Sequence, residues 1–247
     1  MSVDQCSDQY VMALAPRNWI VGVSPHADDS DAFLRRQAKG LPVRRPTLES
    51  LLAAHPDVVV RYWTSDQRLL NGLRQRGIKV VQIEDAKGFD DIRRNIRTIS
   101  KALEREPQGQ AMIAEMDAKL AKSRGAWGGR KALYLTPGGF TSGSGTLVEA
   151  IMDAAGLRNA VTAPGYQPVS LEKFVLQPPD LLVLGFFDEA SGGRWDVGRR
   201  PLVRRIAKGR TVADLPADLL GCPGWFAADA SVRLAEAARG QGAKGSR

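Results

Sequence analysis

LESLLAAHPDVVV at residues 48–60 is a stretch that the chain repeats in recognisable form as LEKFVLQPPDLLV at residues 171–183. Both copies begin with Leu-Glu, continue through an apolar pair and end on Pro-Asp followed by three aliphatic residues. The first apolar residues of each copy fall at helical spacing, and Pro56 and Pro179 end the helix. The aliphatic runs lack polar alternation, which is typical of a strand covered on both faces of a parallel sheet. A helix followed by a buried strand, used twice, predicts an α/β fold with two similar lobes.

The sequence around each copy predicts further strands. IVGVSP at Ile20–Pro25 and KALYL at Lys131–Leu135 each predict a strand that ends in a loop ahead of the repeated unit. After the first copy, Gly77 indicates a helix end and Ile78–Ile83 predicts the next strand. We therefore expect each lobe to run strand, loop, helix, strand, with parallel-type sheets.

Two amphipathic helices connect the predicted lobes. The first carries apolar residues at intervals of three or four, namely Ile92, Ile96, Ile99 and Leu103. Pro107 then favours the first turn of a second helix, which extends to about Lys122 and, at about 24 Å, is long enough to act as a stiff strut. We expect an N-terminal lobe over residues 1–89, connecting helices over 90–124, a C-terminal lobe over 125–239 and a disordered tail over 240–247.

The composition is that of an ordinary globular protein. The 247 residues are enough for one large domain or two of about 120 residues. Lys and Arg outnumber Asp and Glu by 35 to 27, but they are spread from Arg17 to Arg247 rather than gathered in one patch, so nucleic acid is not an expected partner. No apolar run approaches the roughly 18 residues of a membrane helix. The start at Met1 shows no signal peptide, and a mature chain carrying an added Met would look the same.

The two cysteines, Cys6 and Cys222, lie near opposite ends of the chain. Without a CxxC pair or a Cys/His cluster they do not predict a structural zinc site. Cys6 is expected just before a helix that starts near Tyr10, and Cys222 in a turn before a final helix at Ala227–Ala238. In an oxidising compartment the two would form one disulfide, whereas in a reducing cytosol they would stay separate thiols.

In their order along the chain, these pieces resemble the substrate-binding proteins of metal-chelate ABC importers, the periplasmic proteins for ferric siderophores, haem and cobalamin. The resemblance covers nearly the whole chain. It depends on the repeated unit and on three other stretches, SVDQCSDQYVMALAPRNWIVGVSP at residues 2–25, DDIRRNIRTISKALE at residues 90–104 and TLVEAIMDAAGLRNAV at residues 146–161. It implies two α/β lobes joined by a single long rigid helix, with the ligand held in a shallow cleft between the lobes.

The loops after the predicted strands are the expected ligand-binding elements, because ligands of open α/β sheets lie beyond the carboxyl ends of the strands. The residues predicted to bind ligand are His26, Arg61, Tyr62, Trp63, Phe140, Phe186, Phe187, Trp195 and Trp225. Exposed rings either pack against the core of their own lobe or bind a partner. Rings delivered by strand ends in both lobes suit a flat, bulky, partly apolar ligand.

Polar residues in the same loops leave alternatives open. Arg61 is either a charge-assisted donor to a carboxylate or catecholate oxygen or a solvated side chain. His26 is either a ligand of the chelated metal or a surface histidine.

The stretch TPGGFTSGSGT at residues 136–146 lacks GxxxxGK[ST], which excludes a nucleotide P-loop. With only His26 and His55 as histidines and no GxSxG elbow, the sequence predicts no catalytic site, no resident metal and no cofactor.

The resemblance also implies that acidic residues on the outer face of each lobe dock onto a membrane permease. Asp66 is the candidate in the first lobe and Glu149 in the second. Arg68 occupies a position where an acidic residue is expected, which weakens the assignment in the first lobe.

The resemblance implies a monomeric periplasmic binding component of an ABC importer that captures a metal chelate, and the cationic balance and Arg61 make a ferric siderophore the first candidate. Cobalamin, a related corrinoid or haem is the alternative within the same family. A cytosolic α/β enzyme that uses the same cleft is the alternative from another class.

Overall fold

The computed structural model describes residues 1–63, 66–189 and 196–245. The chain divides into two compact units. Unit 1 consists of Met1–Asp85, Asp90–Ala114 and Gly221–Trp225, and unit 2 of Ala86–Phe89, Glu115–Leu220 and Phe226–Arg247. The chain therefore returns to unit 1 near its end, for the short segment at 221–225.

The repeated stretch forms the predicted helix and strand in both copies. In unit 1, α3 (Leu48–Ala53) leads to β1 (Val58–Arg61), and in unit 2, α8 (Leu171–Leu176) leads to β7 (Leu182–Gly185). Each helix begins at a hydroxyl cap: the Thr47 hydroxyl accepts from the Ser50 amide in α3, and the Ser170 hydroxyl accepts from the Lys173 amide in α8. Both strands pair with parallel neighbours, so the predicted α/β fold with parallel sheets is confirmed.

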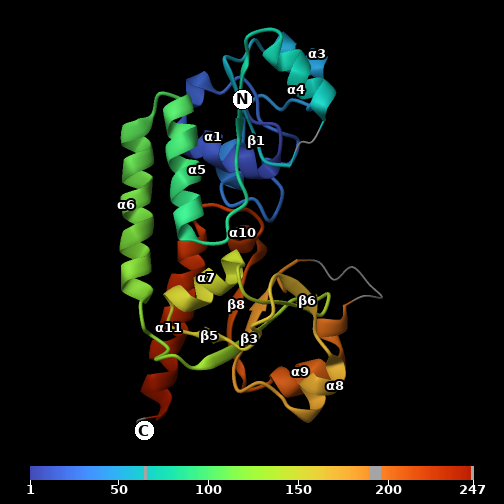
Figure 1. Ribbon diagram of the computed structural model, residues 1–247, viewed down its shortest axis with the longest axis vertical. Coiled ribbons are helices and arrows are strands. Elements are labelled where there is room, and N and C mark those ends of the chain that lie inside the picture. Colours follow the sequence, from blue (N-terminus) through green and yellow to red (C-terminus); the bar gives the residue numbers. More distant parts are fainter. Residues whose placement is uncertain (64–65, 190–195, 246–247) are drawn as a thin grey trace. The chain divides into compact units, whose positions relative to one another are not determined.

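Unit 1 is built on a short parallel sheet. β1 pairs with β2 (Lys79–Gln82), and α4 (Gln67–Arg74) forms the crossover between them. α3 and α4 lie side by side next to this sheet (Figure 1). Their apolar faces and the sheet enclose a core of Met1, Val3, Leu51, Val59, Leu69 and Leu73. Two short helices complete the amino-terminal part, η1 (Arg17–Trp19) and α2 (Arg35–Ala38).

The helix α1 (Gln5–Leu14) begins earlier than predicted. Asp4 caps it, because its carboxylate accepts from the Ser7 amide at 2.9 Å while the Ser7 hydroxyl accepts from the Asp4 amide at 3.1 Å. Cys6 therefore lies in the first turn of α1 and not ahead of the helix. Nearly all of α1 is buried, including its polar residues, so it is a core helix of unit 1.

The strand predicted at Ile20–Ser24 does not form. The segment is extended, but its pairing is confined to an isolated bridge between Val23 and Val43 and a hydrogen bond from the Ser2 amide to the Gly22 carbonyl at 3.1 Å. Pro42, on the opposite segment, has no N–H with which to continue a ladder. The aliphatic pattern predicted the burial of this segment correctly, since Ile20 and Val23 are buried, but not its hydrogen bonding.

The two connecting helices are present as predicted. α5 (Phe89–Ala102) buries its isoleucines completely, and α6 (Glu106–Ser123) follows. α6 passes from unit 1 to unit 2 between Ala114 and Glu115. The chain also crosses between the units around residues 85–90 and 220–226, so α6 is not the sole covalent connection.

Unit 2 contains a four-stranded parallel sheet. Its order is β5 (Arg158–Asn159), β3 (Lys131–Leu135), β7 and β8 (Thr211–Leu215). β4 (Phe140–Ser142) and β6 (Tyr166–Pro168) form a separate antiparallel pair. The remaining elements are α7 (Leu147–Ala154), η2 (Val197–Arg199), α9 (Pro201–Ala207), α10 (Ala217–Leu220) and α11 (Ala227–Gly245).

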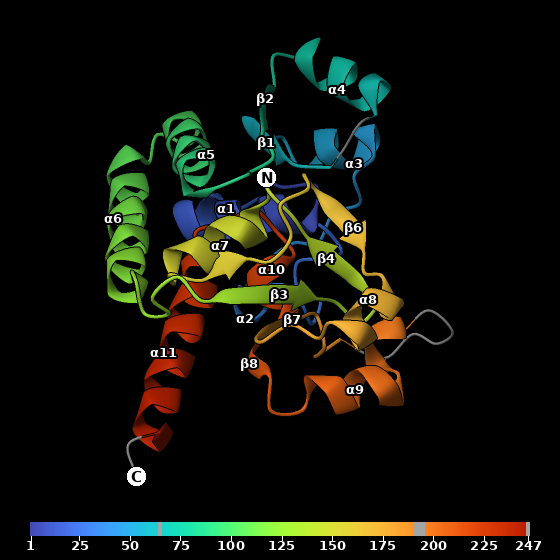
Figure 2. The same ribbon diagram turned by 60° about the horizontal axis from the view of Figure 1, so that its bottom comes forward.

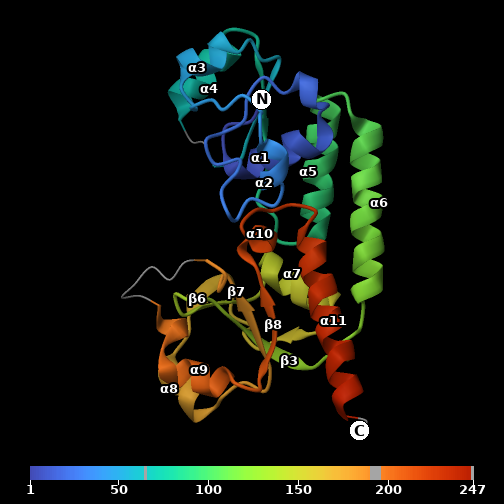
Figure 3. The ribbon, with the colours of Figure 1, turned by 180° about the vertical axis from the view of Figure 1, so that it is seen from behind.

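Helices cover this sheet on both faces. Leu135 and Leu182 point to one face, where they pack with Phe174 of α8 and Val203 of α9. α8 and α9 lie together beside the sheet, and α7 lies on its other side (Figure 2). α11 runs along β8 and α7 (Figure 3), where the Ser231 hydroxyl donates to the Ile151 carbonyl at 3.1 Å.

α11 continues well past the predicted end at Ala238. It is helical to Gly245, so the disordered tail expected from residue 240 is a helix over most of its length. Arg239 donates to the Lys122 carbonyl at 3.0 Å, and Lys119 pairs with Asp229 at 2.9 Å, so α6 holds α11 along its side. Nowhere in the described part of the chain is a helix both long enough and apolar enough to cross a membrane.

Candidate ligand-binding site

The carboxyl end of β1 presents the predicted cluster of unit 1. Arg61 is the last residue of the strand, and its carbonyl accepts from the Ile83 amide at 2.8 Å. Tyr62 and Trp63 then leave the sheet with ring centroids 5.3 Å apart. Trp63 is 59% exposed, whereas Tyr62 is half-buried and its hydroxyl donates to the Asp85 carboxylate. One strand end therefore carries an arginine, followed by a phenol and an indole whose rings lie close together.

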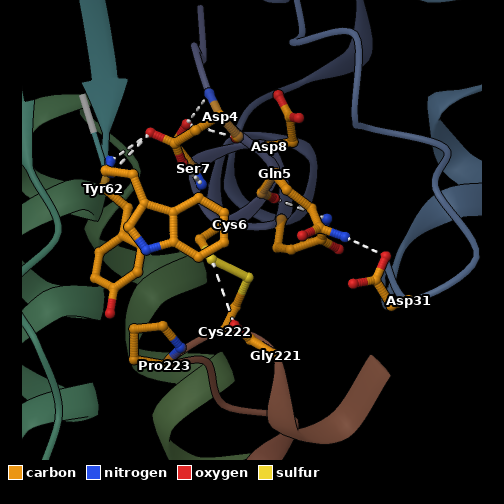
Figure 4. Close-up of a disulfide and its surroundings, with 12 residues drawn as sticks. Asp4, Gln5, Cys6, Ser7, Asp8, Asp31, Tyr62, Gly221, Cys222 and Pro223 are labelled. Atoms are coloured by element: carbon orange, nitrogen blue, oxygen red, sulfur yellow. Dashed lines mark hydrogen bonds between the residues drawn. A yellow bond between two sulfur atoms is a disulfide. The ribbon is translucent and has the colours of Figure 1, made fainter. Parts of the chain in front are cut away.

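Asp4 fixes the backbone of this loop. Its Oδ2 accepts from the Tyr62 amide at 2.6 Å (Figure 4) and from the Trp63 amide at 3.3 Å. Sequence reasoning missed Asp4 in both of its roles. The Asp-x-x-Ser spacing of Asp4 and Ser7 would have indicated the helix cap, but no local signal indicates a contact with a loop so far along the chain.

The loop that carries His26 is also tied to α1. His26 is exposed, with Nδ1 2.8 Å from the Asp29 carboxylate, so its ring makes an ion pair or hydrogen bond with a neighbour in the loop. The amide of Ser24 donates to the buried Asp8 carboxylate at 2.9 Å, and the Leu34 amide donates to Gln9 at 2.7 Å. Burial raises the pKa of Asp8, while its hydrogen bonds from Ser2 and Ser24 act in the opposite direction.

Trp225 is a core residue in this structure, which corrects its predicted role as a ligand contact. Only 9% of the residue is exposed. Its ring meets Tyr10 edge-on at 5.4 Å and Phe33 at 6.3 Å. The prediction failed because the turn before α11 returns to unit 1, where the indole fills an aromatic cluster.

In unit 2 the ends of β3 and β7 border a cavity of about 360 Å³. It is lined by Thr136, Pro137, Gly138, Phe186, Glu189, Asp196 and Arg199. Phe186 follows β7 directly and has a φ of 64°, a left-handed backbone that is uncommon for an aromatic residue and often marks functional sites. Its amide donates to the Leu215 carbonyl at 3.2 Å, so β8 stabilises this conformation.

Arg199 organises the loop after Phe186 and was not predicted. Its guanidinium lies 5.3 Å from the Phe187 ring and donates to the carbonyls of Phe187 at 3.1 Å and Glu189 at 2.8 Å. Phe140, at the start of β4, is 49% exposed. The predicted Trp195 lies outside the described residues.

The two acids predicted to dock a permease both bind backbone amides at a helix N-terminus. Asp66 is the N-cap of α4 and accepts from the Arg68 amide at 2.9 Å. Glu149 lies in the first turn of α7 and accepts from the Gly145 amide at 2.8 Å. Each carboxylate therefore has a structural role at a helix N-terminus in addition to any role in docking.

Cys6 and Cys222 form a disulfide, as predicted for an oxidising compartment, with a Cα–Cα distance of 5.3 Å (Figure 4). The bridge joins α1 to the segment 221–225 within unit 1. Next to it, the Tyr10 hydroxyl donates to the Pro223 carbonyl at 2.6 Å, and burial raises the pKa of this phenol. Within the described ranges, no three His, Cys, Asp or Glu side chains are placed to hold a metal ion.

The family model described as "Periplasmic binding protein" matches residues 2–218. The chain belongs to the periplasmic binding protein family. Comparison with curated protein sequences gives no match.

Solved structures confirm the fold of this periplasmic binding protein. A possible iron-binding (periplasmic solute-binding) protein from Staphylococcus epidermidis superposes with a TM-score of 0.76 at 20% identity, covering 96% of each chain. The periplasmic haem-binding protein RhuT from Roseiflexus sp. RS-1 gives 0.71 at 24% identity, also covering 96% of each. The periplasmic haem-binding protein HutB of Vibrio cholerae gives 0.72 at 21% identity, covering 95% of this chain and 96% of HutB.

Proposed function

We propose that this chain is the substrate-binding component of an ABC importer and captures a metal chelate, with a ferric siderophore as the first candidate ligand. The observation that carries the proposal is the family match together with aromatic residues at strand ends in both units. Tyr62 and Trp63 in unit 1 and Phe187 in unit 2 are the proposed ligand contacts. Arg61 is the proposed partner of the anionic edge of the chelate.

Haem is a second candidate, and a specific observation favours it. Two of the three solved structures named above are haem-binding proteins. Tyr62 offers a phenol whose hydroxyl already faces the Asp85 carboxylate, and a tyrosine is one of the side chains that hold haem iron in proteins. Cobalamin stays a third candidate, which no residue among those that the structure describes favours over the other two.

A thermal-shift panel distinguishes these candidates. The purified protein is heated with a ferric triscatecholate siderophore, with haemin and with cyanocobalamin, each against its metal-free or unloaded control. A ligand at about 100 times its Kd adds about 2.7 kcal/mol to stability, which produces a clear rise in Tm. No rise with any of the three would contradict capture of a metal chelate.

Binding is proposed to occur without turnover. The bound chelate should be recovered chemically unchanged, at one per chain, after the loaded protein is denatured. Release of a modified product at catalytic rates would instead support an enzyme.

The proposed macromolecular partner is the membrane permease of the importer, with this protein acting as a monomer in the periplasm. Asp66→Asn and Glu149→Gln remove one charge each but keep an oxygen for the helix cap. We expect both variants to keep their Tm while uptake of ligand by whole cells falls. Uptake equal to that of the unmodified protein would exclude these two acids from docking.

A further inference from the structure

The buried carboxylate of Asp4 has more hydrogen-bonding capacity than a helix cap requires. Asp4 is 7% exposed, and burying a charge is costly unless it is fully hydrogen-bonded. A serine hydroxyl caps a helix about as well as an aspartate does, without that cost. One oxygen of Asp4 is occupied by the cap, since Oδ1 accepts from the Ser7 amide at 2.9 Å. The second oxygen therefore has a separate role.

That second oxygen accepts from two backbone amides that lie outside the pairing between β1 and β2. The ladder between β1 and β2 ends at Arg61 opposite Gln82, so the N–H groups of Tyr62 and Trp63 lie beyond it. Backbone N–H groups at such a position need an acceptor. Oδ2 of Asp4 accepts from the Tyr62 amide at 2.6 Å (Figure 4) and from the Trp63 amide at 3.3 Å, and a hydrogen bond to a carboxylate is stronger than one between neutral groups.

We propose that Asp4 is a positioning residue, which fixes the backbone of Tyr62 and Trp63 so that their rings are held ready for ligand. The effect of Asp4 on ligand affinity rests on the proposed function, whereas its effect on the backbone of the loop does not. The anchor comes from α1, whose first turn is fixed by the Asp4 cap and by the Cys6–Cys222 bridge. A loop held by a rigid helix loses less conformational freedom when ligand binds.

Asp8 provides a matched control on the same helix. It is also buried, lies one turn beyond Asp4 and accepts from the Ser24 amide and from the hydroxyls of Ser2 and Ser24. Those hydroxyls can turn to accept from an amide NH2, so Asp8→Asn can keep its hydrogen bonds. The partners of Asp4 in the loop are backbone N–H groups, which can only donate.

The decisive variant is Asp4→Ser, because a serine keeps the cap of α1 but is too short to supply the second acceptor. Amide hydrogen exchange of the ligand-free protein, resolved at Tyr62 and Trp63, is the primary measurement. We expect a slow Tyr62 amide in the unmodified protein, about tenfold faster exchange in Asp4→Ser and no change in Asp8→Asn. A fast Tyr62 amide in the unmodified protein overturns the proposal even if the variant fails to fold. Equal exchange in Asp4→Ser and the unmodified protein overturns it as well.

Ligand affinity is measured separately with haemin and with a ferric triscatecholate siderophore as probes. We expect Asp4→Ser to weaken binding of the probe about tenfold and Asp8→Asn to leave it within about twofold. If neither probe binds the unmodified protein, the proposed function fails, while the exchange data still decide whether Asp4 anchors the loop. Unchanged affinity in Asp4→Ser despite a released loop would overturn the role of Asp4 in preparing the rings.

Discussion

At the scale of single residues, two exposed tryptophans of unit 1 occupy contrasting positions. Trp63 is 59% exposed beyond the carboxyl end of β1. Trp19 is 54% exposed at a cavity near the amino end of the same strand, with the Arg105 guanidinium 5.6 Å from its ring. Ligands of α/β sheets lie beyond the carboxyl ends, so of these two residues we expect Trp63 to contact the ligand.

Trp63→Ala should therefore weaken ligand binding by about 1–3 kcal/mol, the cost of truncating a well-packed contact residue. Trp19→Ala is the control with similar exposure, and it should leave the affinity unchanged. Isothermal titration with the chelate that raises the Tm measures both. Equal affinity for the Trp63 variant and the unmodified protein would show that another loop binds the ligand.

The pH dependence of stability provides a test of Asp8. Because its pKa is raised in the folded state, the native protein holds this proton more tightly than the unfolded chain does. The ionisation of Asp8 should therefore lower the free energy of unfolding as the pH rises from about 4, the ordinary pKa of an aspartate, to the higher pKa of Asp8 in the folded protein. Urea unfolding across this range should show a flatter profile for Asp8→Asn. A steeper loss in the variant would mean that the pKa of Asp8 is lowered.

Which site residues could be predicted depended on the range of the interactions that define them. Arg61, Tyr62 and Trp63 follow an aliphatic run, so a local pattern placed them at a strand end. The role of Asp4 and the burial of Trp225 depend on contacts between distant segments, which local spacing does not encode. Arg199 contacts carbonyls 10 and 12 residues earlier, across a loop whose course has no helical or strand periodicity to predict it. The left-handed backbone of Phe186 contradicts the local preference of an aromatic residue, and therefore no propensity rule predicts it.

At the scale of elements, glycine allows two helices to approach closely. A Cβ on Gly109 of α6 would lie 2.6 Å from the Cβ of Ser100 of α5. The helical periodicity predicted both helices, but not this contact, because glycine inside a helix is unfavourable by propensity alone.

Gly109→Ala should lower the free energy of unfolding by about 1–3 kcal/mol, since overpacking exceeds the gain in helix propensity. Gly240→Ala in α11 is the matched control, because no atom lies within 4 Å of its added Cβ. That variant should gain up to about 1 kcal/mol. Urea unfolding of both variants provides the comparison, and a stabilised Gly109 variant would show that α5 and α6 are not in close contact there.

At the scale of the whole molecule, the Cys6–Cys222 bridge links residues separated by 216 positions in sequence. The repeat predicted two α/β units, but their boundaries differ from the continuous lobes expected, because unit 1 includes the late segment 221–225. That segment supplies Cys222 and Trp225 to the environment of α1. Local sequence patterns could not predict that residues 221–225 belong to unit 1, because most of that unit lies more than 100 residues earlier in the chain.

Removing the bridge with the double change Cys6→Ser and Cys222→Ser should destabilise unit 1 by up to about 5 kcal/mol, the chain-entropy value for so long a loop. Hydrogen exchange resolved by segment should show the loss at α1 and not at β3 or β7. Thiol titration of unreduced, denatured protein from the periplasm checks the bond directly. Two free thiols in that titration would refute it.

The return of residues 221–225 to unit 1 also sets an order in time. At about 5–20 residues per second, the 216 positions between the cysteines take about 10–40 s to synthesise. During that interval Tyr10 has been synthesised, but Pro223, whose carbonyl accepts a hydrogen bond from the Tyr10 hydroxyl, has not. The unit whose first residues leave the ribosome earliest is therefore completed late, after the sheet of unit 2 has already been synthesised.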